Sequence, residues 1–490
     1  MSLLPGSTPP LPSRRRFLCS AGGAAAWLGL QGSRSLASLS RFTGAEEALL
    51  ARAKELSTDE PLRLLVPGGC EANLQPIIRR FEQATGGRVS LEPVAVDDVA
   101  THILLRSGPD ASPFDVALPP TFSLPDLVEA DCLAPLDALA DRYEPDGFRD
   151  RMLYALGDSY GGALYGYQTD GDVYVMFYRK SWLQDPKAQD AYEERFGEPL
   201  EIALTFEQLD RQLEFFHRPE EGRYGGALFR NADYIGWEWW LRLHGKGRLP
   251  FDSEGNPQID SAEGVAALED LMAASKFLSP GSKTNGLMDN WGEYSRGETF
   301  ANIGWGGTQK ALCRADSAVR EDLVFGPTPG GLFGGKPTPI SHFNWGWNYV
   351  VSKRSPRVEL GYLFSLLAVQ PEASTLAVAE GEGFFDPFRA EHYGDPAVRR
   401  VYSDAFLEQH RESLKQGIPD LYLRSRSEYF GALNRFLLRA ERGEIAPDQA
   451  LGIIQREWSK IRERVGGDSQ ARQWGELLDK YPEALRKHLS

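Results

Sequence analysis

The sequence predicts an α/β fold in which a mainly parallel sheet carries helices on both faces. Strand-like and helix-like patterns alternate between residues 62 and 130, and this alternation is typical of parallel strands joined by helices. The 490-residue chain is 42% hydrophobic and 25% charged, an ordinary globular composition that excludes global disorder. At roughly 100–200 residues per domain, the length suggests two to four domains.

The first predicted unit is a strand, a loop and a helix. Leu62–Val66 is mostly apolar and ends at Pro67-Gly68-Gly69, which is a loop signal. Ile77, Ile78 and Phe81 then recur at helical spacing before Gly86-Gly87, the kind of sequence at which a helix ends. A helical lead-in over residues 38–60 precedes this unit.

The alternation continues with a second strand at Val89–Val96, a helix at Asp97–Ser107, a third strand at Phe114–Leu118 and a helix near Leu124–Ala130. Ligands of such sheets bind beyond the carboxyl ends of the strands.

Two of those strand ends, Gly68–Asn73 and Pro119–Phe122, are therefore expected at a binding site. The candidate residues that they supply are Glu71, Thr121 and Phe122.

The middle of the chain begins with a polar stretch, Gln168–Asp172, before a β-rich run at Val173–Tyr178. Residues 181–300 are expected to be mostly helical, and Phe300–Gly306 is strand-like. A loop rich in glycine and proline is expected from Gly326 to Pro339. After it come a strand at Asn344–Ser352 and helices from Arg357 onward, interrupted at Gly381–Pro387.

Residues 1–37 are expected to form a signal peptide. Arg14–Arg16 precede Phe17-Leu18, an apolar run from Cys19 to Leu30 follows, and small residues lead to a cleavage site near Ala37. The arginines followed by Phe-Leu are of the twin-arginine type. We therefore expect the mature chain to be exported to the periplasm.

The charge balance bears on possible partners. The chain holds 54 Lys+Arg against 69 Asp+Glu, a formal charge of −15. Nucleic acids and anionic membrane surfaces select basic proteins, so neither is an expected partner. Cys70, Cys132 and Cys313 are widely spaced and odd in number, so no disulfide framework or zinc motif is visible. We also find no nucleotide, dinucleotide or metalloprotease signature, and we predict no cofactor and no metal.

Tryptophan is concentrated in the middle third of the chain. The residues concerned are Trp237, Trp239, Trp240, Trp291, Trp305, Trp345 and Trp347. Trp305 lies between glycines, and Trp345 precedes one, which suits rings that line a cleft and stack on the apolar faces of sugars. For Trp237, Trp239 and Trp240, core packing and ligand contact stay equally open, because three such closely spaced side chains cannot share one helix face.

The stretch Tyr167–Asp172 brings two carboxylates, Asp170 and Asp172, close together. They suit acceptors for sugar hydroxyls. A glycosidase acid/base pair, a calcium loop and a solvated turn are the alternatives. Acidic residues at the site disfavour an anionic ligand such as a sugar phosphate.

The ordered motifs resemble those of the extracellular solute-binding proteins of ABC importers, in the large sugar-binding family that includes maltose-binding protein. The matching pieces lie within residues 61–465: Phe81–Gly86, Phe114–Val116, Leu164–Tyr167 running to Tyr178–Lys180, Phe300–Trp305, Gly346–Lys353, Tyr429–Leu433 and Pro447–Trp458.

The resemblance implies the type II periplasmic binding protein fold, with two α/β lobes, each a mainly parallel sheet flanked by helices, and crossing segments between them. One lobe is expected at residues 38–169 plus 343–385, and the other at 170–342 plus 386–490. The implied crossings lie near Thr169–Asp172, Phe343–Trp345 and Gly383–Pro387.

The resemblance also suggests ligand contacts, and local chemistry adds others. Positions that match sugar contacts in relatives are Thr121, Phe122, Asp172, the Trp237 region, Trp305, and Tyr429 or Phe430. Local chemistry adds Asp170, Asn344, Trp345 and Asp386.

The expected function is capture of a sugar or oligosaccharide between the lobes and its delivery to an ABC-type permease in the inner membrane, by a monomer that performs no chemistry. One alternative is an exported glycosidase or redox enzyme. The other is a sugar-sensing receptor module.

Overall fold

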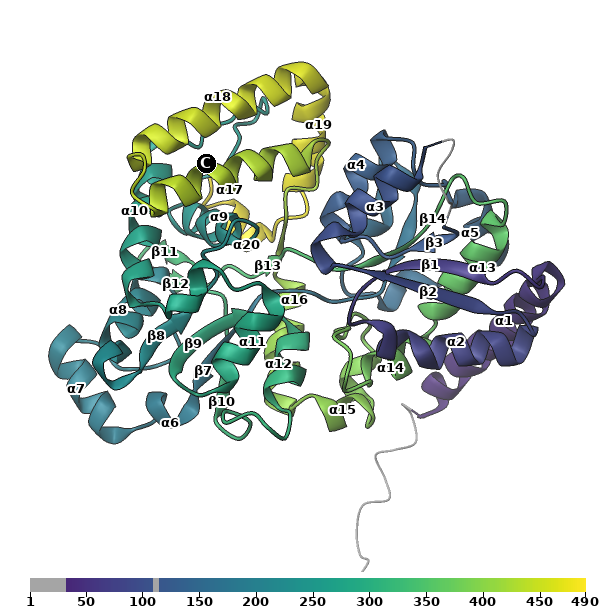
Figure 1. Ribbon diagram of the computed structural model, residues 1–490, viewed down its shortest axis with the longest axis horizontal. Helices are drawn as coiled ribbons and strands as arrows, with labels where there is room; N and C mark the ends of the chain where they lie inside the picture. Colours follow the sequence, from purple (N-terminus) through teal and green to yellow (C-terminus); the bar gives the residue numbers. More distant parts are fainter. Residues whose placement is uncertain (1–31, 109–113) are drawn as a thin grey trace, which may run out of the picture. The chain divides into compact units, whose positions relative to one another are not determined.

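The computed structural model describes residues 32–108 and 114–490. Most of the predicted signal peptide lies outside the described residues. Helix α1 (Gly32–Leu56) covers the predicted helical lead-in at 38–60 up to residue 56. From Glu46 onward the chain forms one compact unit, shown in Figure 1. Among the described helices, none has both the length and the apolar character needed to cross a membrane.

The first sheet has the strand order β2-β1-β3-β14-β6. Its strands are β1 (Leu62–Pro67), β2 (Val89–Val94), β3 (Val116–Ala117), β6 (Gly166–Gln168) and β14 (Asn348–Val351). Strands β2, β1 and β3 pair in parallel, as predicted. Strand β14 is antiparallel to both of its neighbours, β3 and β6.

Helices lie on both faces of the first sheet, as Figure 1 shows. They are α2 (Glu71–Thr85) with α13 (Val358–Ala368), and α3 (Val99–Arg106) with α4 (Leu124–Glu129). Strand β1 is buried along nearly its whole length, because a sheet covered on both faces needs apolar residues on both. Helix α2 ends at Gly86 (φ 74°), whose left-handed backbone favours glycine.

The second sheet has the order β10-β7-β9-β8. Its strands are β7 (Val175–Arg179), β8 (Tyr224–Ala227), β9 (Thr299–Gly304) and β10 (Leu323–Pro327). Only β8 and β9 pair in parallel; β7 is antiparallel to β9 and β10. The expectation of a mainly parallel sheet in each lobe is therefore wrong for this sheet. Strand β7 arrives from the other sheet, so no local strand-helix-strand unit sets its direction.

Two segments expected to lack strands contain them. Strand β8 reads Tyr-Gly-Gly-Ala, without the apolar alternation that signals a strand. A Cβ on Gly225 would lie 2.1 Å from the Leu213 carbonyl oxygen, so this strand needs glycine to pack closely. The predicted loop at 326–339 contains the hairpin β11 (Gly331–Phe333) and β12 (Lys336–Thr338), closed by Gly334-Gly335. Both turn glycines have positive φ, as a two-residue hairpin turn requires.

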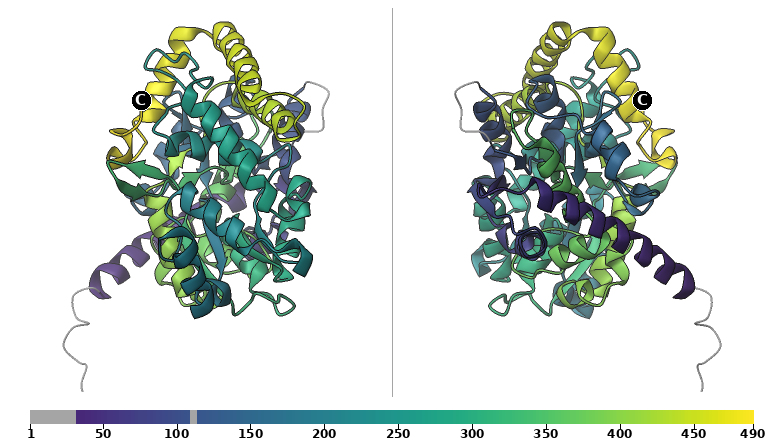
Figure 2. Two further views of the ribbon diagram at one scale, coloured as in Figure 1. Left: turned by 90° about the vertical axis from the view of Figure 1, so that its left-hand side faces the viewer. Right: turned by 90° about the vertical axis from the view of Figure 1, so that its right-hand side faces the viewer.

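Helices build the rest of the second part of the chain. Those before β10 are α6 (Lys180–Leu183), α7 (Pro186–Phe196), α8 (Phe206–Phe216), α9 (Ile235–Gly245), α10 (Ala262–Ala274), α11 (Leu287–Ser295) and α12 (Gly306–Leu312). Those after β14, besides α13, are α14 (Pro371–Val378), α15 (Val398–Val401), α16 (Asp404–Lys415), α17 (Arg426–Glu441), α18 (Pro447–Val465), α19 (Gly467–Leu478) and α20 (Glu483–Arg486). Helices α17 and α18 lie side by side in Figure 2.

The remaining described elements are short. Helix α5 (Asp137–Tyr143) is followed by the strand pair β4 (Ser159–Tyr160) and β5 (Ala163–Leu164). Strands β13 (His342–Phe343) and β15 (Ile418–Pro419) form a two-stranded parallel pair.

Three segments carry the chain between elements of the two sheets. The chain leaves the first sheet after β6, returns to it at β14 and leaves it again between α14 and α16. The predicted crossings at 169–172, 343–345 and 383–387 coincide with these segments. The exact lobe bounds stay a prediction.

Candidate functional site

A cluster of aromatic rings lies where these segments meet. The ring centroid of Trp345 lies 5.4 Å from that of Trp237 and 5.8 Å from that of Trp305. Tyr234 stacks on Trp237 at 5.3 Å, and Tyr174 lies 4.7 Å from Trp305. The three tryptophans are only 2–4% exposed, and they pack against one another edge to face.

Helix α9 resolves the question of its three tryptophans. Trp239 donates its indole N–H to the carbonyl of Gly264 in α10, and Trp240 packs on Phe430. Trp237 alone joins the ring cluster, and its Nε1 donates to Asp420 at 3.2 Å. Packing therefore explains two of these residues, and the site includes the third.

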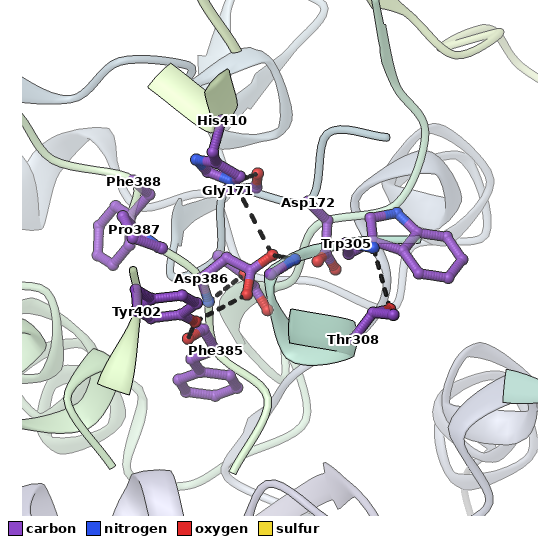
Figure 3. A network of polar contacts seen from close by, with 12 residues as sticks. Gly171, Asp172, Trp305, Thr308, Phe385, Asp386, Pro387, Phe388, Tyr402 and His410 are labelled. Atoms are coloured by element: carbon purple, nitrogen blue, oxygen red, sulfur yellow. Dashed lines mark hydrogen bonds and ion pairs between the residues drawn. The ribbon is translucent and has the colours of Figure 1, made fainter. Parts of the chain in front are cut away.

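Trp305 is held at the junction of β9 and α12. Its backbone N–H donates to Thr308 Oγ1 at 3.1 Å, the contact drawn in Figure 3. Its indole Nε1 donates to Asn344 Oδ1 at 3.0 Å. These bonds fix the ring plane from two elements that are distant in sequence.

A narrow pocket opens beside Asp172. The residues that line it are Val96, Asp172, Leu287, Trp291, Trp305, Gly307, Trp345, Trp347 and Phe384. Val96 follows a strand of the first sheet and Trp305 follows a strand of the second, so the pocket lies between elements of both. Its free volume is about 20 Å³, which is room for about one water molecule.

A wider pocket of about 500 Å³ is also lined by Trp345, and its volume is within the usual size range of small-molecule sites, ~300–1,000 Å³. Four predicted site residues line it: Phe122, Trp237, Trp345 and Phe430. The Arg426 guanidinium lies 3.8 Å from the ring centroid of Phe122 and 4.0 Å from that of Phe430. Arg426 also pairs with Asp420, the acceptor of the Trp237 indole.

Three buried carboxylates tie the crossing segments together, and Figure 3 labels two of them, Asp172 and Asp386. Asp170, Asp172 and Asp386 bring oxygens within 4.8 Å of one another. Asp170 Oδ1 accepts the Asp386 backbone N–H at 2.7 Å, and Asp172 Oδ2 accepts that of Gly346 at 3.3 Å. Each bond links one crossing segment to another.

Asp386 is anchored from a further side. It accepts the Gly306 N–H at 2.5 Å and the Tyr402 hydroxyl at 3.0 Å. Because Asp170 and Asp386 are occupied by backbone contacts and fully buried, the three carboxylates do not offer the two accessible, opposed groups that glycoside hydrolysis uses.

Burial controls the charge of this carboxylate cluster. Desolvation raises the pKa of all three carboxyls, and repulsion from neighbouring carboxylates raises the pKa of Asp170 and Asp172 further. Burial also lowers the pKa of Lys310 to about 8, against the opposing effect of Asp386 and Asp170. The Lys310 ammonium donates to three carbonyl oxygens, those of Val378, Glu380 and Phe385.

His410 lies 3.9 Å from Asp386 Oδ2. Burial lowers the pKa of His410 to about 4, so the ring is neutral near pH 7 and forms no ion pair there. It instead bonds through Nε2 to the Gly171 carbonyl at 2.9 Å.

Five predicted residues line neither pocket: Glu71, Thr121, Asp170, Asn344 and Asp386. Glu71 begins α2 and accepts the Gly69 backbone N–H at 2.6 Å. Thr121 donates to Asn348 Oδ1 at 2.6 Å. Phe122, next to Thr121, lines the wider pocket.

Sequence reasoning missed several residues that surround these pockets. Tyr234, Trp347, Phe384 and Arg426 line the pockets, whereas Tyr174 packs on Trp305 and Lys310 interacts with Asp386 and Asp170. Trp347 shares the Asn-Trp-Gly-Trp stretch that pointed to Trp345, so its signal was present. Arg426 comes from a C-terminal helix, and no local pattern in the sequence indicates its contact with Phe122.

Several solved structures share this fold. A solute-binding protein of Agrobacterium radiobacter K84 in complex with ribitol is 18% identical, with a TM-score of 0.69 over 83% of this chain and 100% of that chain. One from Thermotoga lettingae TMO bound to α-D-tagatose is 17% identical, with a TM-score of 0.70 over 82% and 100%. Maltose-bound MalE3 of T. maritima is 18% identical, with a TM-score of 0.67 over 82% and 99%. The chain thus has the two-lobed fold of periplasmic binding proteins.

Sequence comparison separately identifies the family. No curated protein matches the chain significantly in sequence. The family model described as bacterial extracellular solute-binding protein matches residues 77–400, about two-thirds of the chain. The chain therefore belongs to the bacterial extracellular solute-binding protein family.

Proposed function

We propose that this protein captures a sugar or polyol among the rings of Trp237, Trp305 and Trp345 and delivers it to an ABC-type permease. The observation that carries the proposal is a set of buried polar atoms without partners among the described residues. They are Trp345 Nε1, Asn344 Nδ2 and Asp170 Oδ2. Unpaired buried polar groups are costly, and a hydroxylated ligand provides partners for donors and acceptors of this kind.

Besides the polar atoms, a sugar site needs apolar surfaces, and the aromatic rings provide them. Flat ring faces pack on the C–H faces of sugars, while charged acceptors bond the hydroxyls. The solved relatives that hold ribitol, maltose and tagatose support this ligand class. We assign Phe122, Trp237, Trp305, Asn344, Trp345 and Phe430 to the ligand side, with Asp172 as the acceptor.

Ligand entry requires movement, since the pocket beside Asp172 has room for about one water molecule. The two lobes, 38–169 plus 343–385 and 170–342 plus 386–490, move apart by hinge rotation at the crossing segments. Asp170, Asp172 and Asp386 connect those segments. The ligand then favours the closed arrangement by touching both sides.

The protein acts as an exported monomer that binds without chemistry. A twin-arginine signal peptide over residues 1–37 directs it to the periplasm, where the closed form docks on permease subunits of the inner membrane. The close, buried and hydrogen-bonded carboxylates support binding over hydrolysis.

Calorimetry against mono- and oligosaccharides and polyols tests this function. We expect one of them to bind, and Trp305→Ala to weaken that binding at least tenfold, because the variant loses a ring face. Trp182→Ala is the matched control, since Trp182 packs on Phe300 and lines neither pocket. Absence of binding across the panel contradicts the proposal, and so does a Trp305→Ala affinity equal to that of the control. Release of a cleaved product would identify an enzyme.

A further inference from the structure

The pocket beside Asp172 has the composition of an aromatic cage. Five rings line it: Trp291, Trp305, Trp345, Trp347 and Phe384. Asp172 is the one charged residue in the lining, which contains no lysine, arginine or histidine. Aromatic faces attract cations through the negative charge of the ring face, and such cages recognise quaternary ammonium groups. A carboxylate at the edge of the cage strengthens that attraction.

The faces of these five rings are not occupied by a cation of the protein. Within residues 44–108 and 114–490, no lysine or arginine lies over any of them. The wider pocket differs, because the Arg426 guanidinium there already covers Phe122 and Phe430. The cage beside Asp172 therefore lacks a positive charge, whereas the wider pocket already contains that of Arg426.

The hydrogen-bonding capacity of the cage is small. Trp291 Nε1 already donates to Thr308 Oγ1, and Trp305 Nε1 to Asn344. The N–H groups of Trp345 and Trp347 and the Asp172 carboxyl remain. The several hydroxyls of a neutral sugar ring each need a partner when buried, whereas an alkylated ammonium group needs few.

The charged groups near Asp172 also favour a positively charged ligand. Three carboxylates lie within 4.8 Å, and the nearby Lys310 ammonium donates to carbonyl oxygens of the backbone. Asp172 accepts one backbone N–H, at 3.3 Å, which is long for a bond to a carboxylate, and its other polar partner is the neighbouring carboxyl of Asp386. Burial and the nearby Asp386 raise the pKa of Asp172, and a positive group in the cage would lower it again and favour the charged carboxylate.

We propose that the ligand of this protein carries a protonated or quaternary nitrogen, which lies among the rings of the cage against Asp172. An aminated sugar or polyol meets this requirement. The inference rests on the proposed function, because it assigns a charge to the ligand of that same site.

Two measurements test the charge. First, tetramethylammonium chloride is titrated into the full-length protein and tryptophan fluorescence is followed, with sodium chloride matched for ionic strength. We expect a saturable change with the organic cation alone. Second, calorimetry compares glucosamine with glucose, and we expect at least tenfold tighter binding of the amine.

Asp172→Asn should weaken tetramethylammonium binding at least tenfold and abolish the preference for glucosamine. The control Asp131→Asn removes one carboxylate that is exposed and paired with Lys353, and should bind within twofold of the natural protein. Should Asp172→Asn fail to fold, Trp291→Leu tests the same cage by removing one ring face, with the same expected loss.

The outcomes separate the two proposals. Absence of saturable tetramethylammonium binding, or an Asp172→Asn variant that binds it as tightly as the control, overturns the cage. Glucose binding as tightly as glucosamine overturns the charge preference and leaves sugar capture standing. Binding of the organic cation without binding of any sugar or polyol keeps the cage and removes the sugar assignment.

Discussion

One buried carboxyl, that of Asp158, is hydrogen-bonded to the residue that precedes the first crossing segment. Its Oδ1 accepts the Gln168 backbone N–H at 2.6 Å and the Asn348 side-chain N–H at 3.0 Å, while its Oδ2 has no partner. Gln168 is the last residue of β6, directly before the first crossing. Burial raises the pKa of Asp158 to about 7, although the two hydrogen bonds oppose the rise.

The raised pKa makes part of the stability depend on pH. In the unfolded chain an aspartate loses its proton near pH ~4, whereas folded Asp158 keeps its proton up to about pH 7. Between those values the folded state binds more protons, so stability is highest at low pH and falls as pH rises toward 7. Asp158→Asn, which keeps an acceptor oxygen but cannot ionise, should lose less stability over this window, by on the order of 2 kcal/mol. Urea unfolding at pH 5 and pH 8 checks this. If the free energy of unfolding changes by the same amount between pH 5 and pH 8 in both proteins, the ionisation assigned to Asp158 is wrong.

Helix α9 is positioned by a buried ion network. Glu238 accepts bonds from Arg230 at 2.6 and 2.9 Å and from Arg242 at 2.9 Å, and Arg242 also pairs with Asp210. Burial alone would raise the pKa of Glu238, but the two guanidinium groups outweigh it and hold that pKa below its usual value. The network orients the helix that presents Trp237 to the site.

Glu238→Gln should therefore destabilise the protein by about 3 kcal/mol, because it leaves two buried guanidinium groups without a full counter-charge. The matched control is Glu428→Gln, whose partner Arg464 is exposed and whose loss should cost within about 0.5 kcal/mol. Denaturant unfolding followed by circular dichroism gives both values. A Glu238→Gln loss no larger than that of the control would show that the network contributes little.

The first crossing segment depends on a glycine. A Cβ on Gly171 would lie 2.1 Å from the Pro387 carbonyl oxygen and 3.2 Å from the His410 ring, so two crossing segments touch here. Gly171→Ala should separate them and cost about 1–3 kcal/mol.

Gly475→Ala serves as the comparison, since nothing lies within 4 Å of a Cβ there. This substitution in helix α19 should be neutral or stabilising by up to about 1 kcal/mol. Differential scanning calorimetry of the two variants gives the contrast. A Gly171→Ala variant as stable as Gly475→Ala would argue against a tight crossing.

Within residues 46–490 the region where the crossing segments meet is tightly packed. The ring cluster is nearly fully buried, and the pocket beside Asp172 has room for about one water molecule. A binding protein must open to admit its ligand and close around it.

Small-angle scattering should therefore show a larger radius of gyration for the free protein than for the protein saturated with ligand. The direction follows from hinge closure, because the ligand stabilises contacts from both lobes. An inert protein of similar mass, measured at the same concentration, controls for interparticle effects. Identical scattering with and without a bound ligand would contradict hinge closure.

Local signals in the chain were enough for the first sheet. The strands β1 and β2, the helices α2 and α4, and the parallel pairing of β2-β1-β3 were predicted because each depends on periodicity and on glycine or proline at its ends. The same kind of signal did not reveal β8, whose glycines are required by a neighbouring helix, or the direction of β7, which is set by the return of the chain from another sheet.

Some residues of the candidate site could also be predicted from local sequence, and others could not. Glycine beside tryptophan pointed to Trp305 and Trp345 from neighbouring residues alone, and the resemblance to a known family led to the two-lobed fold. Only the tertiary structure decided that Trp237 faces the rings while Trp239 and Trp240 pack elsewhere, that Asp170 and Asp386 meet, and that Arg426 covers Phe122. The contacts of Trp237 with Trp345, of Asp170 with Asp386 and of Arg426 with Phe122 join residues 108, 216 and 304 positions apart. Their energies depend on distance and burial, which a local pattern of residues does not contain.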